Sequence, residues 1–181
     1  LEIIHDGKDF NFDDAEGITG IGISTKKDDL NKIGKFGVGF KSVFAVTKSP
    51  TIESGEFHFQ IDDFVIPRQL SLNGISGTKI ALPFNHPKRE NEEVFTIVEN
   101  KLQDIGLKTL LFLSNINEIK WKTPSKQGHY LKSVNSFENV NSAKKVSIIS
   151  QTVDEEYFEE YLVIEKLITI DRKELIAEIA Y

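Results

Sequence analysis

Apolar residues in the first half of the chain recur in short runs that predict alternating strands and helices. The run Leu1–Ile4 predicts a strand, and Asn11 or Asp13 is placed to cap a short helix over Asp14–Ile18. Helical spacing returns farther along, at Phe40, Val43 and Phe44, and predicts a buried helix. Three more strands are predicted over Thr51–Glu53, Glu56–Ile61 and Thr78–Leu82, with turns at Ser54-Gly55 and Ser76-Gly77.

The second half begins with the clearest amphipathic helix and is otherwise rich in strands. The apolar face of this helix consists of Val94, Phe95, Val98, Leu102 and Ile105, with Asn91 placed as its cap and Gly106 at its end. Strands are predicted over Lys108–Leu113, Glu118–Lys122, His129–Val134, Lys144–Ser150, Tyr161–Ile168 and Leu175–Tyr181. We therefore expect one domain over residues 1–122 and an incomplete, strand-rich region over residues 123–181.

Composition restricts the class of protein. Of the 181 residues, 39% are hydrophobic and 28% charged, as in ordinary folded domains, and no apolar run approaches the length of a membrane span. The absence of cysteine excludes disulfides and thiol catalysis and is typical of a cytoplasmic protein. A net charge of −6 argues against binding along a nucleic-acid backbone. Because the chain starts at Leu1 without an initiator Met, we expect it to be cut from a longer protein.

The stretch IGKFGVGF, Ile33–Phe40, departs from this acidic composition. It contains three glycines and lies in a basic island formed by Lys26, Lys27, Lys32, Lys35, Lys41 and Lys48. One interpretation is a solvated, lysine-rich loop. The other is an anion site, because glycines let backbone N–H groups approach a ligand and a helix N-terminus follows. The two common phosphate loops do not fit: Phe40 breaks the P-loop register, and the glycine order is not that of a Rossmann turn.

IGKFGVGF and the following KSVFAV resemble the second glycine box of the GHKL ATPases, the family of gyrase B, large heat-shock chaperones, histidine kinases and MutL. Two more elements occur in the family's order: a first box near His5-Asp6-Gly7 and the pair Gly77-Thr78 in GTKIALPF. The short segment IGISTKKDD, in the position of the nucleotide lid, is most similar to the sacsin-type branch, which is related to the heat-shock chaperones. The motifs cover residues 1–84, and the resemblance extends more loosely to Trp121.

The resemblance implies an α+β fold: a two-layer α/β sandwich with a mostly antiparallel mixed sheet, the Bergerat ATP-binding fold, followed by the strand-rich region. It implies a cytoplasmic, chaperone-like ATP-binding module in which nucleotide closes a short lid and switches conformation or association with a second subunit or other domains. The implied nucleotide-binding residues are His5, Asp6, Gly7, Lys26, Gly34, Lys35, Phe36, Gly37, Val38, Gly39, Phe40 and Thr78. Backbone N–H groups of the glycine box would surround the triphosphate, Lys35 would lie near the γ-phosphate and Thr78 beneath adenine. Phe40 fits the core better than an adenine platform.

Two departures from the family pattern affect this interpretation. The first box of the family is Asp-x-Gly-x-Gly, but alignment on Gly7 puts His5 at the Asp position, so either His5 or the neighbouring Asp6 is the expected adenine reader. The Glu-x-x-x-Asn helix, which supplies the general base and a Mg²⁺ ligand in the family, does not occur before the first box. We therefore expect no catalytic residue in this chain, the magnesium ligand upstream of it, and little ATP hydrolysis by the piece alone.

Other chemistry is sparse. His5, His58, His86 and His129 are far apart in the sequence and predict no metal site. The alternative function is a degenerate module that has lost nucleotide binding and acts as an interaction scaffold. Neither function predicts membrane or direct nucleic-acid binding.

Overall fold

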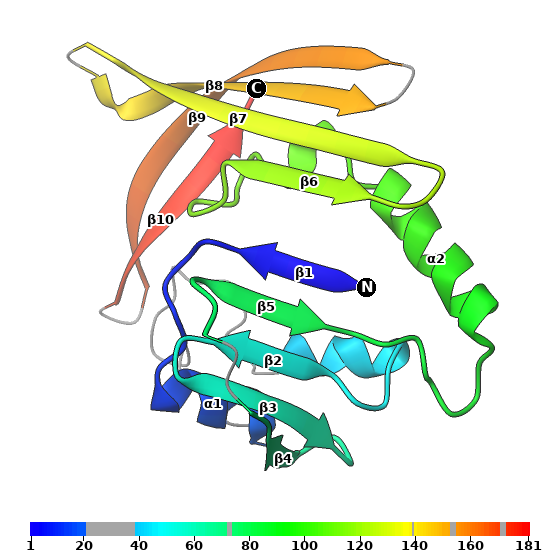
Figure 1. The fold of residues 1–181 in the computed structure, drawn as a ribbon. Helices are drawn as coiled ribbons and strands as arrows, with labels where there is room; N and C mark the ends of the chain where they lie inside the picture. Colours follow the sequence, from blue (N-terminus) through cyan, green and yellow to red (C-terminus); the bar gives the residue numbers. More distant parts are fainter. Residues whose placement is uncertain (21–38, 72–73, 139, 153–154, 171–172) are drawn as a thin grey trace. The chain divides into compact units, whose positions relative to one another are not determined.

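The computed structural model describes residues 1–20, 39–71, 74–138, 140–152, 155–170 and 173–181. They fall into two compact units, Leu1–Thr96 and Ile97–Tyr181. Each unit contains one five-stranded sheet (Figure 1). Within the described residues, no helix is both long and apolar enough to cross a bilayer.

The first unit is built on a sheet of short antiparallel strands in the order β1-β5-β2-β3-β4. Its strands are β1 (Glu2–His5), β2 (Thr51–Ser54), β3 (Phe57–Asp62), β4 (Ile66–Gln69) and β5 (Thr78–Ala81). The first strand in sequence pairs with the last, because β1 lies antiparallel to β5 at one edge of the sheet. Segments more than 70 residues apart in the sequence thereby become neighbours.

One face of this sheet forms the core of the first unit. Ile52, Phe59 and Ile61 alternate toward it and contact Phe44 of the 3-10 helix η1 (Phe40–Ala45). Helix α1 (Phe12–Thr19) packs on the same cluster and lies with η1 behind the sheet in Figure 1. Its N-terminus is fixed by a capping box, in which the Asn11 side chain accepts from the Asp14 N–H and the Asp14 carboxylate accepts from the Asn11 N–H.

The second unit contains longer strands, in the order β10-β9-β8-β7-β6, and every pair is antiparallel. These strands are β6 (Glu118–Lys122), β7 (Gln127–Phe137), β8 (Val140–Thr152), β9 (Glu156–Ile170) and β10 (Lys173–Ala180). The sheet curls into a half-barrel (Figure 1). Tyr130, Val146, Ile148 and Val163 on its inner face pack with Leu110 and Leu111.

The remaining elements are α2 (Asn91–Gln103), which begins in the first unit and ends in the second, and the 3-10 turn η2 (Leu107–Thr109). The predicted amphipathic helix is thus confirmed. A strand over Lys108–Leu113 is wrong: the N–H groups of Thr109, Leu111 and Leu113 instead bond to carbonyls three residues back. Burial of the two leucines in this segment does not require a strand, because a tight turn can also place both side chains against one apolar surface.

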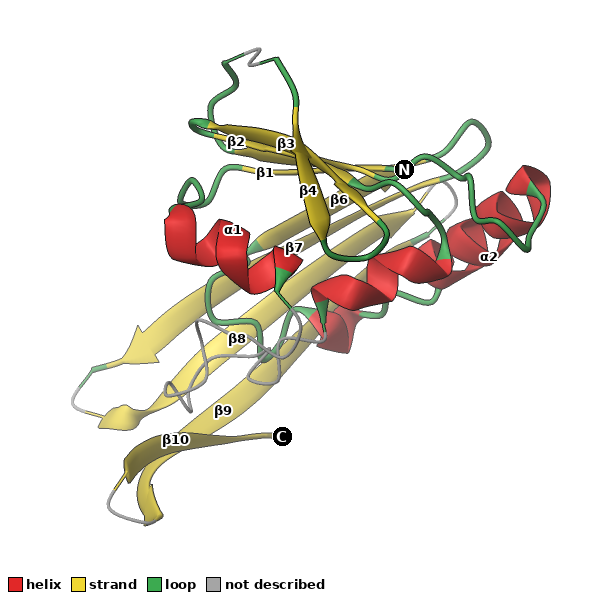
Figure 2. Ribbon diagram, turned by 90° about the horizontal axis from the view of Figure 1, so that it is seen from below, coloured by secondary structure: helices red, strands yellow, loops and turns green. Residues whose placement is uncertain are grey.

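The predicted two-layer α/β sandwich of the Bergerat type is also wrong. The described chain is mostly β, with two antiparallel sheets and only two substantial helices (Figure 2). The sheet is not mixed, since every strand pair in it is antiparallel. Only α1 and the short η1 contribute helical residues to the core of the first sheet, so the described residues do not form a full helical layer. Most of the strands predicted from the sequence are present, whereas the full helical layer was implied only by the family resemblance.

Candidate functional site

Strand pairing brings the first box next to the Gly-Thr pair. His5 at the end of β1 lies opposite Thr78 at the start of β5. Gly77 makes this approach possible: its φ is +83°, and a Cβ placed on it would lie 2.5 Å from the backbone oxygen of His5. Any side chain at position 77 would push the two strand ends apart.

Two buried hydroxyls join this strand pair to the loop that follows β1. The Oγ of Ser54 lies 2.5 Å from Oγ1 of Thr78 and accepts a hydrogen bond of 2.9 Å from the N–H of Phe10. Both hydroxyl-bearing residues have no solvent exposure. The neighbouring Gly55 has φ +55°, and a Cβ there would lie 3.2 Å from that of Asp9. The Asp6–Phe10 loop is therefore held against β2 and β5.

The two candidate adenine readers differ in what they can accept. Nδ1 of His5 accepts a hydrogen bond of 3.2 Å from the N–H of Gly7. In a neutral ring this geometry puts the proton on Nε2, which makes the remaining nitrogen a donor. The Asp6 carboxylate is exposed and has no hydrogen bond to another described residue. Within the part of the chain that the structure describes, Asp6 is therefore the one of the two with an acceptor that no other residue occupies.

Most of the glycine box lies outside the described residues. Gly34, Lys35, Phe36, Gly37 and Val38 of the box lie there, as does Lys26 of the segment in the lid position, and their binding roles stay predictions. Gly39 precedes η1 with helical dihedrals, φ −57° and ψ −50°, and its carbonyl accepts from the Ser42 hydroxyl at 2.8 Å. Phe40 is half-buried and packs on the core cluster of the first sheet, the position its spacing predicts.

Lys41, directly after the glycine box, makes hydrogen bonds to two backbone carbonyls of the first unit. Nζ of Lys41 donates to the carbonyl oxygen of Phe64 at 2.7 Å and to that of Thr19 at 3.4 Å, at the end of α1. Burial lowers the pKa of Lys41 below its ordinary value. Lys41 therefore ties η1 to α1 and to the β3–β4 turn, and its charge is used within the first unit.

Sequence reasoning missed Ser54 and the Phe10 N–H as parts of this site. The Ser-Gly dipeptide is a turn signal, and Gly55 does occupy a turn with positive φ. The burial of the serine hydroxyl arises from the neighbouring strand β5, which no local signal predicts. Glu53, one residue earlier, was likewise missed: it is 7% exposed, and its Oε1 has no hydrogen-bond partner among the described residues.

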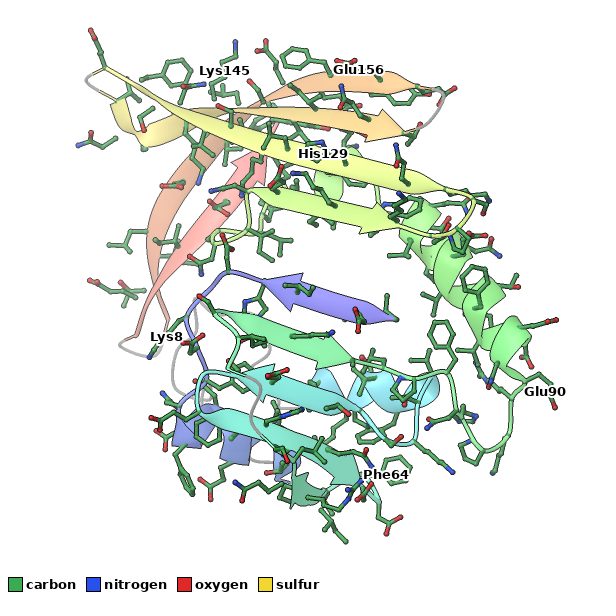
Figure 3. All side chains as sticks on the ribbon, in the orientation of Figure 1. Lys8, Phe64, Glu90, His129, Lys145 and Glu156 are labelled. Atoms are coloured by element: carbon green, nitrogen blue, oxygen red, sulfur yellow. The ribbon has the colours of Figure 1, made fainter. Side chains whose placement is uncertain are left out.

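A hollow lies at one end of the second sheet, in the unit that holds none of the residues predicted to bind nucleotide. It has a volume of about 670 Å³ and is lined by Lys120, Trp121, Lys122, Gln127, Gly128, His129, Gln151, Thr152, Glu155 and Glu156. His129 on β7 and Glu156 at the start of β9 point outward from the sheet (Figure 3). Nε2 of His129 lies 2.7 Å from Oε1 of Glu118; hydrogen bonds from Lys120, then from His129, lower the pKa of that carboxyl. The described residues hold no group of three or more metal-ligating side chains, here or elsewhere.

Comparison with known proteins places a similarity over the first sheet. The family model described as the Sacsin domain matches residues 3–81. The protein NO VEIN of Arabidopsis thaliana is 31% identical over 126 residues, which is 56% of this chain but 5% of that protein. Human sacsin is 43% identical over 53 residues, 29% of this chain and 1% of sacsin. No solved structure matches the chain.

The matched segment contains the whole of the site described above, from His5 to Thr78. The chain spans only a small fraction of either relative, so the similarity concerns a module and not their full architecture. Residues 3–81 match the Sacsin domain, and the chain is distantly similar to sacsin and to NO VEIN.

Proposed function

We propose that the segment matching the Sacsin domain is an ATP-binding module. The observation that carries this proposal is the pairing of His5 with Thr78, which unites two of the three motifs singled out in the sequence. The third motif ends at Phe40, which packs on the same core cluster as Phe10 and Ile80. The described end of the glycine box and the residue that ends the loop after the first box therefore pack on one small core, which supports a ligand shared between them.

The chemistry available to a nucleotide differs along this site. Asp6 supplies a free carboxylate, which accepts hydrogen bonds and matches the exocyclic amino group of adenine. The backbone N–H groups of Gly34–Gly39 and the charge of Lys35 are proposed to bind the phosphates. The described residues offer Mg²⁺ no group of three ligands, so we assign neither the metal nor a hydrolytic step to them.

Calorimetry with Mg-ATP on the intact protein tests the proposal, with Asp6→Ala as the informative variant. We expect the wild type to bind and Asp6→Ala to bind at least about tenfold more weakly, because a hydrogen bond to a charged group contributes about 1.5–3 kcal/mol. Glu16→Ala is the matched control, since it removes an exposed carboxylate from α1. It should leave the affinity unchanged.

Two results would contradict this proposal in different ways. If the wild type binds no ATP at millimolar concentration, nucleotide binding is wrong and the interaction-scaffold alternative takes its place. If His5→Ala weakens binding more than Asp6→Ala does, ATP binding stands but the assignment of the base-reading group is wrong.

A further inference from the structure

We infer that Ser54 is a positioning residue that fixes the Asp6–Phe10 loop and thereby sets which purine the site prefers. This inference rests on the proposed ATP binding. Ser54 itself need not touch the ligand, since its hydroxyl is fully buried between two protein partners. Its effect would be transmitted through the loop that carries Asp6.

The hydroxyl of Ser54 connects three separate segments. It accepts from the N–H of Phe10, which is 44 residues away in the sequence, and bonds with Thr78, 24 residues away. A hydroxyl oxygen has two lone pairs and one hydrogen, so it can accept the backbone bond and still share a hydrogen with Thr78. Alanine at this position would leave the Phe10 N–H without its acceptor and Thr78 without its hydroxyl partner.

Both ends of the loop are anchored. Apart from the bond between the Gly7 N–H and the His5 ring, Ser54 provides the only side-chain hydrogen bond from the sheet to the loop among the described residues. His5 ends β1 opposite Thr78. At the other end Asn11 caps α1 through the capping box, directly after Phe10. Only residues 6–9 lie between these anchors, and Asp9 already contacts the Gly55 position closely. Loss of the Phe10 bond therefore releases a segment whose first residue is Asp6.

Fixing the loop that carries Asp6 matters more for the preference between two purines than for the overall affinity. Adenine and guanine carry the same phosphates and ribose, but they differ in the groups at positions read by hydrogen bonds. A carboxylate held in place discriminates between an amino group and a carbonyl oxygen, because the second offers it no hydrogen and repels its charge. A loosely held carboxylate can move away from the unfavourable group, and the discrimination falls.

The test compares Ser54→Ala with Thr47→Ala in the intact protein. Thr47 is the matched control because it is also fully buried and its hydroxyl donates to Oδ1 of Asn85 at 3.0 Å, outside the loop. Dissociation constants for ATP and for GTP are measured for both variants, at a temperature where circular dichroism shows both to be folded. Hydrogen exchange of residues 6–10 without nucleotide is measured in parallel.

We expect Ser54→Ala to lower the ratio of ATP to GTP affinity at least fivefold and to accelerate exchange over residues 6–10. Thr47→Ala should leave both unchanged even if it melts at a lower temperature. Ser54→Cys, which nearly preserves volume but has a weaker acceptor, keeps the test available if the alanine variant does not fold, and its ratio should move in the same direction. A wild-type ratio in the folded serine variants would overturn the inference while leaving ATP binding intact, whereas a wild type that binds neither nucleotide would overturn the proposed function and this inference with it.

Discussion

The two sheets of the chain achieve their registers by different means. Strands of the first sheet have only four to six residues, and its loops are set by close backbone contacts, three positive-φ glycines and one buried hydroxyl pair. Strands β7, β8 and β9 of the second sheet have 11 to 15 residues, and their registers are set by long ladders and by ion pairs between side chains. The register of the first sheet depends on a few irreplaceable positions, whereas the register of the second sheet is fixed by many residue pairs.

This difference matters for function, because the short strands leave little else to hold the candidate site. A four-residue strand such as β1 has few bonds to its single neighbour, so one displaced residue changes the position of His5 and of the loop after it. In a ladder as long as β8–β9, a local change is opposed by pairs on both sides. Substitutions in the first sheet should therefore cost more stability than similar substitutions in the second.

Gly77→Ala should produce the largest effect. The new methyl group would lie 2.5 Å from the backbone oxygen of His5, at a φ of +83° that alanine rarely adopts. We expect a loss of about 3 kcal/mol in the free energy of unfolding, because backbone strain and a clash with a carbonyl act together. Urea denaturation measures it. Gly74→Ala is the control: it shares a positive φ of +68° but meets no described atom within 4 Å, so about 1 kcal/mol is expected. Equal losses in the two variants would show that the contact with His5 is unimportant.

Gly128→Ala makes the corresponding change in the second sheet. Its methyl group would lie 2.6 Å from Cε2 of Trp121 on the paired strand β6. Here the neighbour is a side chain that can rotate, so we expect a smaller loss of about 1.5 kcal/mol in the free energy of unfolding.

The double variant Trp121→Phe with Gly128→Ala checks this explanation. The smaller ring leaves room for the methyl group, so Gly128→Ala should cost less in the Trp121→Phe background than in the wild type. An unchanged cost would mean that the strain lies in the backbone, and the contrast between the two sheets would disappear.

The sequence predicted most strands of the two sheets but only part of the candidate site. Alternating apolar residues predicted β2, β3, β5 and β6 to within about a residue. The segments predicted for the longer β7, β8 and β9 lie inside the observed strands. Strand β4 was missed because Pro67 and polar neighbours give no strand signal; it lies at the sheet edge, where proline is tolerated. For the candidate site, the motif residues His5 and Thr78 were identified, but the bond between Ser54 and Phe10 was not. This bond joins the hydroxyl of a residue in a turn motif to a backbone N–H far away in the sequence. Whether two such groups meet depends on which strands become neighbours.

Lys144→Met should have the smallest effect on stability of the three substitutions. Nζ of Lys144 on β8 bonds with Glu165 on the neighbouring strand β9 and, at 2.8 Å, with Glu178 on β10, the next strand beyond it. The side chains of Lys144, Glu165 and Glu178 are 25%, 32% and 21% exposed. Burial lowers the pKa of Lys144, but the two carboxylate bonds outweigh it and the net shift is upward. Because the group remains partly solvated and the ladder continues on both sides, we expect a loss of only about 1 kcal/mol at neutral pH.

The pH dependence of that loss distinguishes the ion pair from simple packing. The hydrogen bond from Lys144 lowers the folded-state pKa of Glu165 below its ordinary value of 4.5. The stabilising contribution of the Glu165 carboxylate is therefore complete above pH 4.5 and disappears as the pH falls through its lowered folded-state pKa. The raised pKa of Lys144 keeps its own contribution present below 10.5 and loses it only at higher pH. Urea denaturation of wild type and Lys144→Met should differ most between these limits and converge in acid. Lys101→Met is the matched control: it removes a bridge to Asp104 in which both side chains are exposed, so its cost at neutral pH should be smaller than that of Lys144→Met. A difference between wild type and Lys144→Met that stays constant into acid would mean that the lysine stem, and not its charge, stabilises the second sheet.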